Sequence, residues 1–485
     1  MDTVLGAEKN KNHKHVFGVH SYPKNPTTKK RSQGIFQFIC KDEGECDEWI
    51  RAVNNCAREG DVSIEARVPK ILIYINPFGG TKKARTIFET KLLPLLKIAN
   101  VKWEKMETEY AGHAAEHASK IDIDSYDALV TISGDGLFYE VLNGLLGRKD
   151  WEKAIKIPLG IIPGGSGNAL ATASVGVLDP LTSAFCVLRG MARPFDIGSI
   201  LQKSRRTFFF LAFSWGIIAD VDFDSETMRW LGSFRFTVTA VKKIIKLKLY
   251  KGKLEYILDD EWEAKESNLC TPNCKHCCES GLKSFHALRS MGPTSPRTEK
   301  NLESLLESKS GSASKEENGT KEEEPVEANQ ELKEETNEEK EKLEEKEGKK
   351  GKDELKEQSN VDEKSKKSAS TIDFSVDARH GPAFKYIGEN PTEKEQNWVT
   401  LEAEDFVSVS IGNVTHINHD MISTPYAHWS DGKIDLSYIR RVKKTQMVNR
   451  NHTFNSLSQT KKKQRSICLE SLKRENMSLT QMLLI

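Results

Sequence analysis

One carboxylate, Asp135, lies between two glycines in the segment Thr-Ile-Ser-Gly-Asp-Gly of residues 131–136. The apolar run 127–133 is typical of a buried strand, and the apolar spacing of residues 137–146 is typical of a helix. A carboxylate at such a turn can hold a magnesium ion, or it can accept the proton of an attacking hydroxyl group. The alternative is a plain N-cap of the helix. We expect the dipole of this helix to keep Asp135 ionised.

Two further glycine turns each follow a strand-like run and precede a helical one. Residues 75–81 read Ile-Asn-Pro-Phe-Gly-Gly-Thr, and residues 162–170 read Ile-Pro-Gly-Gly-Ser-Gly-Asn-Ala-Leu. Glycine lets the backbone approach a ligand closely, and the helix that follows offers its positive end to a phosphate. Neither turn is a Walker A loop or a complete dinucleotide fingerprint. Three such turns in one parallel sheet would face the same rim and form a cradle for a polyphosphate.

The elements around these turns predict the fold class. Strand and helix patterns alternate between residues 68 and 200, and the strands are almost continuously apolar. This pattern predicts an α/β fold with a parallel sheet covered by helices on both faces. From residue 201 onward strand patterns dominate, with one helical segment from 225 to about 249, so we expect a second, β-rich domain.

A charged segment interrupts the second domain. Residues 263–395 lack regular patterning, and within them residues 300–368 are mostly Glu, Lys, Ser and Asn. Such a composition buries too little apolar surface to offset the entropy of ordering, so we expect a disordered insertion that regulatory proteins can bind. We therefore expect an N-terminal extension at 1–62, the α/β domain at 66–200, the β-rich domain at 201–262 plus 396–445, the insertion at 263–395 and a polar tail at 446–485.

The N-terminal extension contains a strand-like run at 34–40 and an amphipathic helical run at 42–57 that includes Trp49. A strand followed by such a helix resembles the closing elements of a pleckstrin-homology domain, although the segment is too short for a whole one. The alternative is a small extension that packs on the next domain.

Composition and charge narrow the function classes. The 485 residues carry a net charge of +1, which argues against nucleic acid as the main partner. No apolar signal segment begins the chain, and the longest apolar run, 207–219, is too short to span a bilayer as a helix. Nine cysteines in this context are typical of reduced thiols. We expect a cytoplasmic protein.

The turns, taken in order, resemble a known family. The segments NPFGG, SGDGLFYEVLNGL and IIPGGSGNALA are similar to those of the lipid kinase family of diacylglycerol, sphingosine and ceramide kinases. Residues 213–222 and 225–237 are very similar to sphingosine kinases, and residues 397–401 and 427–436 continue the likeness. The resemblance covers about 66–262 and 396–442.

This resemblance implies ATP-dependent phosphorylation of the primary hydroxyl of a sphingoid base, which gives sphingosine 1-phosphate, with ATP and Mg²⁺ as cofactors. Residues 66–200 would then be the ATP-binding catalytic domain and the β-rich domain the lipid-binding one. Asp135 matches the catalytic base, and Asp222, together with residues 133–136, matches the substrate site. The residues that match nucleotide contacts are Asn76, Pro77, Phe78, Gly79, Gly80, Thr108, Ser133, Gly134, Gly136, Ser166, Arg229 and Arg235.

The lipid substrate implies peripheral contact with a membrane surface. The lysine-rich stretch 242–253 is a candidate for that contact, because anionic lipids attract basic segments. A solvated helix face is the alternative reading of the same stretch.

Two departures from the sphingosine kinase pattern leave alternatives open. Sphingosine kinases carry an Asp-Gly-Glu turn after the strand that matches 433–439; no such turn follows Arg441 here, so a catalytically impaired lipid-binding isoform is one alternative. The cysteine-rich segment 270–278 and the segment 228–232 resemble ceramide kinases, so ceramide kinase is another. The cysteines are too crowded for a standard zinc site, and we interpret them as free thiols.

Overall fold

The computed structural model describes residues 3–59, 68–257, 375–381, 398–441 and 477–478, apart from residues 81, 166, 203, 233, 378–379, 419–420, 425 and 431. The chain divides into two units, Met1–Ser290 with Phe374–Ile485, and Met291–Asp373. All described residues belong to the first unit. The cysteine-rich segment 270–278 and most of the charged insertion lie outside the described residues.

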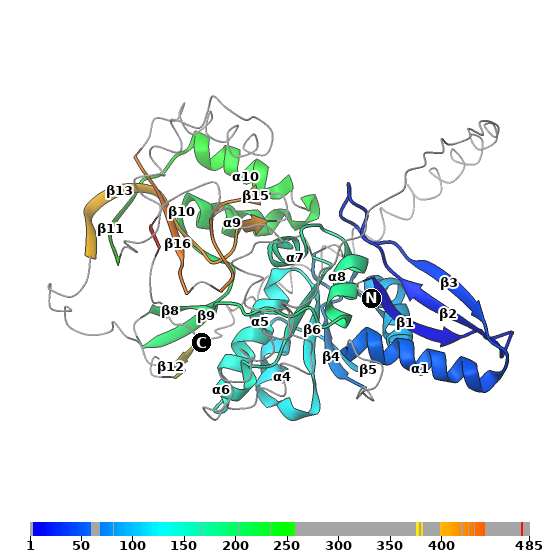
Figure 1. The fold of residues 1–485 in the computed structure, drawn as a ribbon. Coiled ribbons are helices and arrows are strands. Elements are labelled where there is room, and N and C mark those ends of the chain that lie inside the picture. The colour runs from blue at the N-terminus through cyan, green and yellow to red at the C-terminus, as the bar shows by residue number, and fades with distance from the viewer. Residues whose placement is uncertain are drawn as a thin grey trace, which may run out of the picture. The chain divides into compact units, whose positions relative to one another are not determined.

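A four-stranded parallel sheet forms the centre of the α/β domain, as predicted (Figure 1). Its order is β5-β4-β6-β7, so all four carboxyl ends lie at one edge. The strands β4 and β6 are almost wholly buried, because helices cover both faces and their residues are apolar at nearly every position. The strand bounds are Lys70–Ile75 for β4, Lys102–Glu107 for β5, Ala128–Ser133 for β6 and Leu159–Pro163 for β7.

The helices of this domain connect successive strands. Apolar spacing in the sequence predicts one helix at 86–96; the structure has three linked helical pieces there, with a π-helical turn, η1, between α2 and α3. Sequence patterns missed the short α6 and the buried α8. The bounds are Ala84–Ile87 for α2, Phe88–Leu92 for η1, Leu93–Ile98 for α3, His113–Lys120 for α4, Ile123–Ser125 for η2, Asp135–Leu146 for α5, Trp151–Ala154 for α6, Ala169–Val175 for α7 and Pro180–Leu188 for α8.

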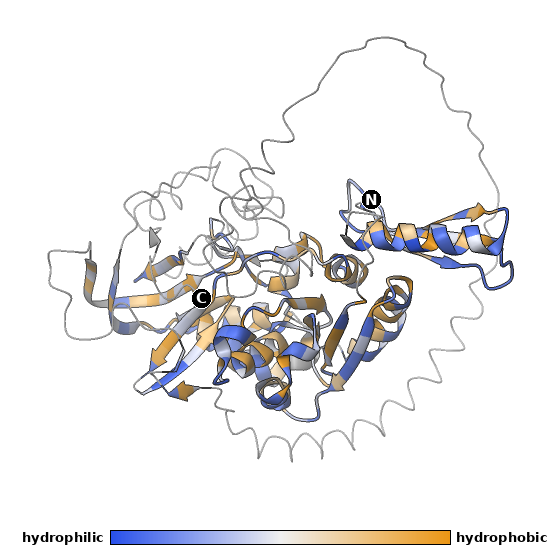
Figure 2. Ribbon diagram, turned by 60° about the horizontal axis from the view of Figure 1, so that its bottom comes forward, coloured by the Kyte–Doolittle hydropathy of each residue, from blue (hydrophilic) through white to orange (hydrophobic). Residues whose placement is uncertain are grey.

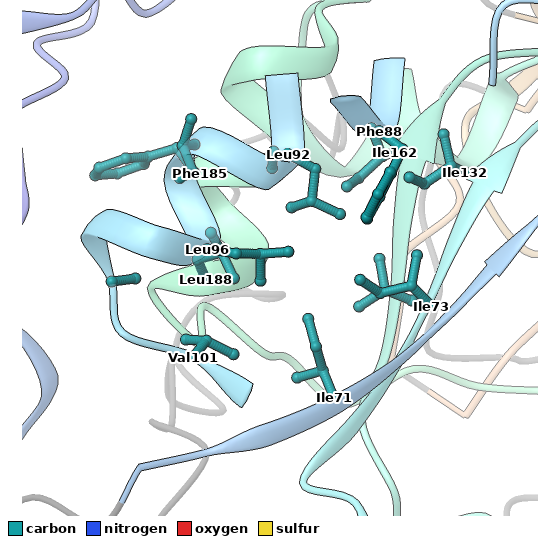
Figure 3. Close-up of a cluster of buried hydrophobic side chains, with 14 of the residues drawn as sticks. Ile71, Ile73, Phe88, Leu92, Leu96, Val101, Ile132, Ile162, Phe185 and Leu188 are labelled. Carbon is teal, nitrogen blue, oxygen red and sulfur yellow. The ribbon is translucent and has the colours of Figure 1, made fainter. Parts of the chain in front are cut away.

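The main hydrophobic core lies between one face of this sheet and helices η1, α3 and α8 (Figure 3). Ile71 and Ile73 of β4 point toward Leu92 and Leu96, and all four side chains are fully or almost fully buried. Each such side chain contributes roughly 2 kcal/mol of hydrophobic stabilisation. This core holds the strands whose ends carry the glycine turns.

The second region is β-rich, as predicted. Its strands form a five-stranded sheet around the long β13, a three-stranded sheet of order β12-β9-β8 and the hairpin β14-β15. The strand bounds are Gly198–Gln202 for β8, Arg205–Phe209 for β9, Ala212–Gly216 for β10, Tyr250–Ile257 for β11, Val376–Asp377 for β12, Trp398–Gly412 for β13, His416–Asn418 for β14, Met421–Ile422 for β15, Asp435–Arg440 for β16 and Met477–Ser478 for β17.

Several boundaries in this region differ from the sequence-based ones. Apolar patterns in the sequence predict one strand at 207–214, but the structure has two, β9 and β10. The patterns also predict separate strands at 397–401 and 406–411, which are the single strand β13. The helical segment begins earlier than residue 225. It consists of α9 (Ile217–Ser225), the 3₁₀-helix η3 (Glu226–Leu231) and α10 (Phe234–Ile245).

The expected disorder of 263–395 is wrong at one place. Residues 376–377 form β12, which pairs antiparallel with β9. The carbonyl of His380 accepts a hydrogen bond from Arg206 at 2.9 Å, and the ring of His380 lies 2.7 Å from the carbonyl oxygen of Leu146 at the end of α5. Composition missed this contact because a few residues with long-range partners are enough to order a short segment. Two residues of the expected tail, 477–478, likewise pair with β16.

The N-terminal region is a three-stranded antiparallel sheet with one helix, α1 (Glu43–Glu59), packed mainly on β1. The strands β1 (Val4–Lys9) and β2 (Val16–Ser21) fall in a polar stretch and were not predicted; β3 (Gly34–Ile39) was. Hydrophobic residues recur between hydrophilic ones along α1 (Figure 2). An amphipathic helix has apolar residues at every third or fourth position in this way. Arg58 donates to the carbonyl of Ala99 at 2.8 Å, so this region packs on the α/β domain.

Candidate active site

Asp135 stands at the start of α5, directly after the end of β6. Its carboxylate accepts the backbone N–H groups of Ala169 at 2.9 Å and Leu170 at 3.1 Å, one on each oxygen. These N–H groups belong to the first turn of α7, so the carboxylate caps a helix other than its own. The sequence suggested a plain N-cap of α5 as the alternative; the capped helix begins more than thirty residues further along the chain. Each oxygen keeps a lone pair that can accept a proton.

The environment of Asp135 controls its ionisation. Burial raises the pKa of the carboxyl above 3.8, and the hydrogen bonds from Ala169 and Leu170 oppose that rise. Desolvation by burial has a larger effect on this pKa than the hydrogen bonds have. We expected the helix dipole to keep Asp135 ionised, and that expectation did not include desolvation. A raised pKa makes the carboxylate a stronger base than an exposed aspartate, provided that it is ionised at working pH.

The second and third glycine turns touch each other through bare backbone. A Cβ on Gly165 would lie 2.3 Å from the nitrogen of Gly134, and a Cβ on Gly134 would lie 2.5 Å from the carbonyl oxygen of Gly167. Backbone cannot give way at such distances, so glycine is required at Gly134 and Gly165. By contrast, a Cβ on Gly136 would meet no atom within 4 Å, so space lies open beside Asp135.

The first turn is built on Asn76. Its Oδ1 accepts the N–H groups of Phe78 at 3.0 Å and Gly79 at 2.8 Å, which forms an Asx turn. Gly80 has a φ of 56°, a conformation that favours glycine. Pro77 is buried, whereas Phe78 is exposed.

Two neighbouring strand ends complete the rim. The N–H of Thr108, just after β5, donates to the carbonyl of Ile75 at 2.9 Å, which holds Thr108 beside the first turn. The hydroxyl of Ser133 donates to the carbonyl of Gly134 at 2.8 Å. The structure thus brings the predicted residues of β4, β5 and β6 to one sheet edge. Ser166 lies outside the described residues.

Asn168 is a site residue that motif analysis missed. Its side chain accepts from the N–H of Gly165 at 3.2 Å and donates to the carbonyl of the same residue at 2.8 Å. It therefore closes the third turn. Its place directly before a helix, after Gly167, was the available signal.

The predicted residues of the second region lie on α9, η3 and α10. Asp222 is exposed on α9, as a residue that receives a ligand must be. The two arginines were expected on one helix, but Arg229 lies in η3 and Arg235 at the start of α10. The side chain of Arg229 is not described.

The guanidinium of Arg235 is 6% exposed and forms an ion pair with Glu226 at 2.7 Å. Its Nε is buried and makes no hydrogen bond within the described part of the chain. A phosphate could bond this Nε, or replace Glu226 at the Nη1 atom. Glu226 was not predicted, and no local pattern distinguishes it from other surface acids.

No cluster of three or more metal-ligating side chains occurs among the described residues. Magnesium that keeps most of its waters and binds phosphate oxygens needs few protein ligands.

Comparison with known proteins shows which proteins this chain is similar to. Residues 70–200 match the model of the diacylglycerol kinase catalytic domain. The chain is 42% identical to Sphingosine kinase 1 of Arabidopsis thaliana over 195 residues, which are 39% of this chain and 40% of that one. It is 39% identical to Sphingosine kinase 1 of Homo sapiens over 208 residues, 41% of this chain and 54% of that one.

A ceramide kinase is also a relative. The chain is 30% identical to Ceramide kinase of Homo sapiens over 258 residues, 50% of this chain and 47% of that one. The chain thus spans roughly half the length of the curated relatives that it matches. The matched part includes the sheet edge, the three glycine turns and Asp135. Residues 70–200 therefore match a diacylglycerol kinase catalytic domain, and the chain is similar to sphingosine kinases and to a ceramide kinase over about half of its length or less.

Proposed function

We propose that this protein transfers the terminal phosphate of ATP to the primary hydroxyl of sphingosine or a related sphingoid base. The observation that carries the proposal is the position of Asp135: a partly buried carboxylate at an open glycine turn, on the sheet edge that carries all three glycine turns. Two relatives match 50% of this chain each, and the identity is 35% to Sphingosine kinase 2 of Homo sapiens and 30% to Ceramide kinase of Homo sapiens.

The residues around the rim fit a nucleotide triphosphate. The turn that Asn76 organises and the turn that Asn168 closes present backbone at the carboxyl edge of the sheet. These turns supply few positive charges for the phosphates. Arg235 is a suitable source of positive charge, because its buried Nε makes no hydrogen bond in the described part of the chain. ATP supplies the phosphoryl group, and Mg²⁺ neutralises its charge when bound.

Asp135 then acts as the general base. The open space beside Gly136 admits a primary hydroxyl, and a carboxylate oxygen accepts its proton as the oxygen attacks. The N–H groups of Ala169 and Leu170 fix the carboxylate in place, so it needs no reorientation during the reaction. Asp222, exposed on α9, is placed to pair with the ammonium group of the sphingoid base.

The lipid substrate requires access to a membrane, and we assign that contact to α10. Phe234, Val241 and Ile245 are exposed at helical spacing on one side of α10, next to the exposed Lys242 and Lys246. Apolar and basic side chains so arranged suit an anionic membrane surface. No single helix in the described ranges has the length and apolarity to cross a bilayer; only the bent pair α7 and α8 does so jointly. We propose that α10 attaches peripherally to the cytoplasmic surface of a membrane.

Asp135→Asn tests the base assignment. The amide keeps the size of the side chain but cannot take a proton, so we expect turnover with sphingosine to fall at least about 100-fold. ATP binding, measured by calorimetry, should persist. Glu152→Gln, which makes the same change of carboxylate to amide at an exposed position outside the proposed site, is the matched control. Turnover of Asp135→Asn equal to that of the unaltered chain would refute the role.

Ceramide is the second candidate substrate, favoured by the 30% identity to human ceramide kinase and by the segment 228–232. A side-by-side assay with sphingosine, ceramide and diacylglycerol separates the two proposals. We expect sphingosine to be phosphorylated fastest. Faster turnover of ceramide would replace the proposed substrate, and no turnover with any lipid would indicate a lipid-binding protein without catalysis.

A further inference from the structure

The strand β3 of the N-terminal sheet has one open edge. The sheet order is β1-β2-β3, and no described segment pairs with the outer side of β3 (Figure 1). The N–H of Cys40, just after β3, donates to the carbonyl of His15, just before β2, at 2.8 Å. Cys40 therefore directs its backbone groups toward β2. Backbone groups alternate along an antiparallel strand, so the odd-numbered residues Ile35, Gln37 and Ile39 direct their N–H and C=O groups to the open edge.

The side chains of β3 are unusually apolar for such an edge. Phe36 and Phe38 are 59% and 48% exposed, and Ile39 is 84% exposed. Exposed edge strands normally carry a charge or a proline that prevents pairing, and β3 has neither between Gly34 and Ile39. This edge is therefore suited to add another strand.

The face beside this edge is also apolar. Phe38 stacks on Phe17 with ring centroids 5.3 Å apart, and Phe17 is buried beneath α1, so Phe38 lies on the helix side of the sheet. On α1, Asp47 bonds β1 through Lys9 and Cys46 faces the sheet. Trp49 is two residues after Asp47 and so projects from the other side of the helix, toward β3. Trp49 is 54% exposed.

The two ends of β3 carry opposite net charge. Lys29, Lys30 and Arg31 precede the strand, and Lys41, Asp42, Glu43 and Glu45, which are together acidic, follow it. Antiparallel pairing of β3 with β3 of a second copy places the basic end of one strand beside the acidic end of the other. Unlike charges at both ends favour this orientation and disfavour the parallel one.

We propose that β3 pairs with β3 of a second copy of this chain, antiparallel and centred on Gln37, to form one continuous six-stranded sheet. In this register Ile35 faces Ile39 of the other copy, and the outward backbone groups of the odd-numbered residues bond one another. Phe36 faces Phe38 as a non-hydrogen-bonded pair, in which side chains approach most closely. The two copies of Trp49 cover these aromatic pairs.

Charge variants test the register with a matched control. Ile35→Lys/Ile39→Lys places lysine opposite lysine, whereas Ile35→Lys/Ile39→Glu places lysine opposite glutamate. In sedimentation velocity over a range of protein concentrations, we expect the unaltered chain and the Lys/Glu variant to dimerise. The Lys/Lys variant should be monomeric, with unchanged circular dichroism. An unaltered chain that stays monomeric, or a Lys/Lys variant that dimerises equally, overturns the proposal.

Cysteine pairing tests the axis. Directly opposite residues in a hydrogen-bonded antiparallel pair have Cα atoms about 5.5 Å apart, within reach of a disulfide. Gln37→Cys should therefore give a covalent dimer on mild oxidation. Ile35→Cys alone should not, but mixed with Ile39→Cys it should give the covalent heterodimer of the two variants. Equal cross-linking of Ile35→Cys with itself contradicts the register.

Discussion

At the scale of single residues, the ionisation of Asp135 governs the proposed chemistry. A general base works only when ionised, so activity should rise with pH through the pKa of the carboxyl. Burial raises this pKa above 3.8. We expect the acid limb of the pH profile of kcat/KM to lie above pH 3.8, with ATP and lipid binding measured across the same range as the control. A limb at or below pH 3.8 would contradict the role of burial.

The paired glycines give a second prediction at this scale. Gly165→Ala places a methyl group 2.3 Å from the nitrogen of Gly134, so the two turns must separate. We expect a loss of about 3 kcal/mol in the free energy of unfolding, measured with chemical denaturant. Gly136→Ala enters open space and should change stability by less than about 1 kcal/mol. Equal losses in the two variants would show that backbone contact between the turns is unimportant.

At the scale of elements, α5 joins the two regions of the molecule. It begins at Asp135, and further along it Asn143 pairs with the backbone of Phe208 in β9: Oδ1 accepts the N–H and Nδ2 donates to the C=O, both at 3.0 Å. The helix that carries the proposed base is therefore fixed to the β-rich region by a buried side chain. Its position depends on contacts at both of its ends.

Asn143→Leu tests this connection. Leucine has the same number of side-chain heavy atoms and the same branching but leaves two buried backbone groups of Phe208 without their partner, which should cost about 3 kcal/mol. The measurement is denaturant unfolding, and Asn12→Leu, at an exposed position, is the control. A loss no larger than that of the control would mean that water or another group replaces the amide.

At the scale of the whole molecule, the charged unit 291–373 and the segment 375–381 should behave differently. Replacement of 291–373 by a short Gly/Ser linker should change the free energy of unfolding by less than about 1 kcal/mol. Extension of the deletion to residue 381 also removes β12 and the hydrogen bond from Arg206 to His380. We expect that longer deletion to destabilise the protein by at least about 2 kcal/mol in the same assay. Equal stability of the two deletions would refute a structural role for 375–381.

The sequence by itself determined the α/β class, the three turns at one sheet edge and the position of Asp135 in the middle turn. Strand and helix periods, and glycines between them, are local signals, and a parallel sheet necessarily gathers the carboxyl ends of its strands. Sequence patterns missed β1 and β2 because these short strands each contain a glycine and lie within an otherwise polar stretch, and they divided β13 into two strands.

Only the tertiary structure decided which groups meet across long stretches of chain. It showed that Asp135 caps α7, that Glu226 holds Arg235, and that the segment 375–381 packs against β9 and α5. None of these contacts follows from a period or a motif, because each joins residues whose spacing in the sequence is set by folding. The same reason applies to the pKa of Asp135, since desolvation depends on which atoms surround the carboxyl in the folded protein.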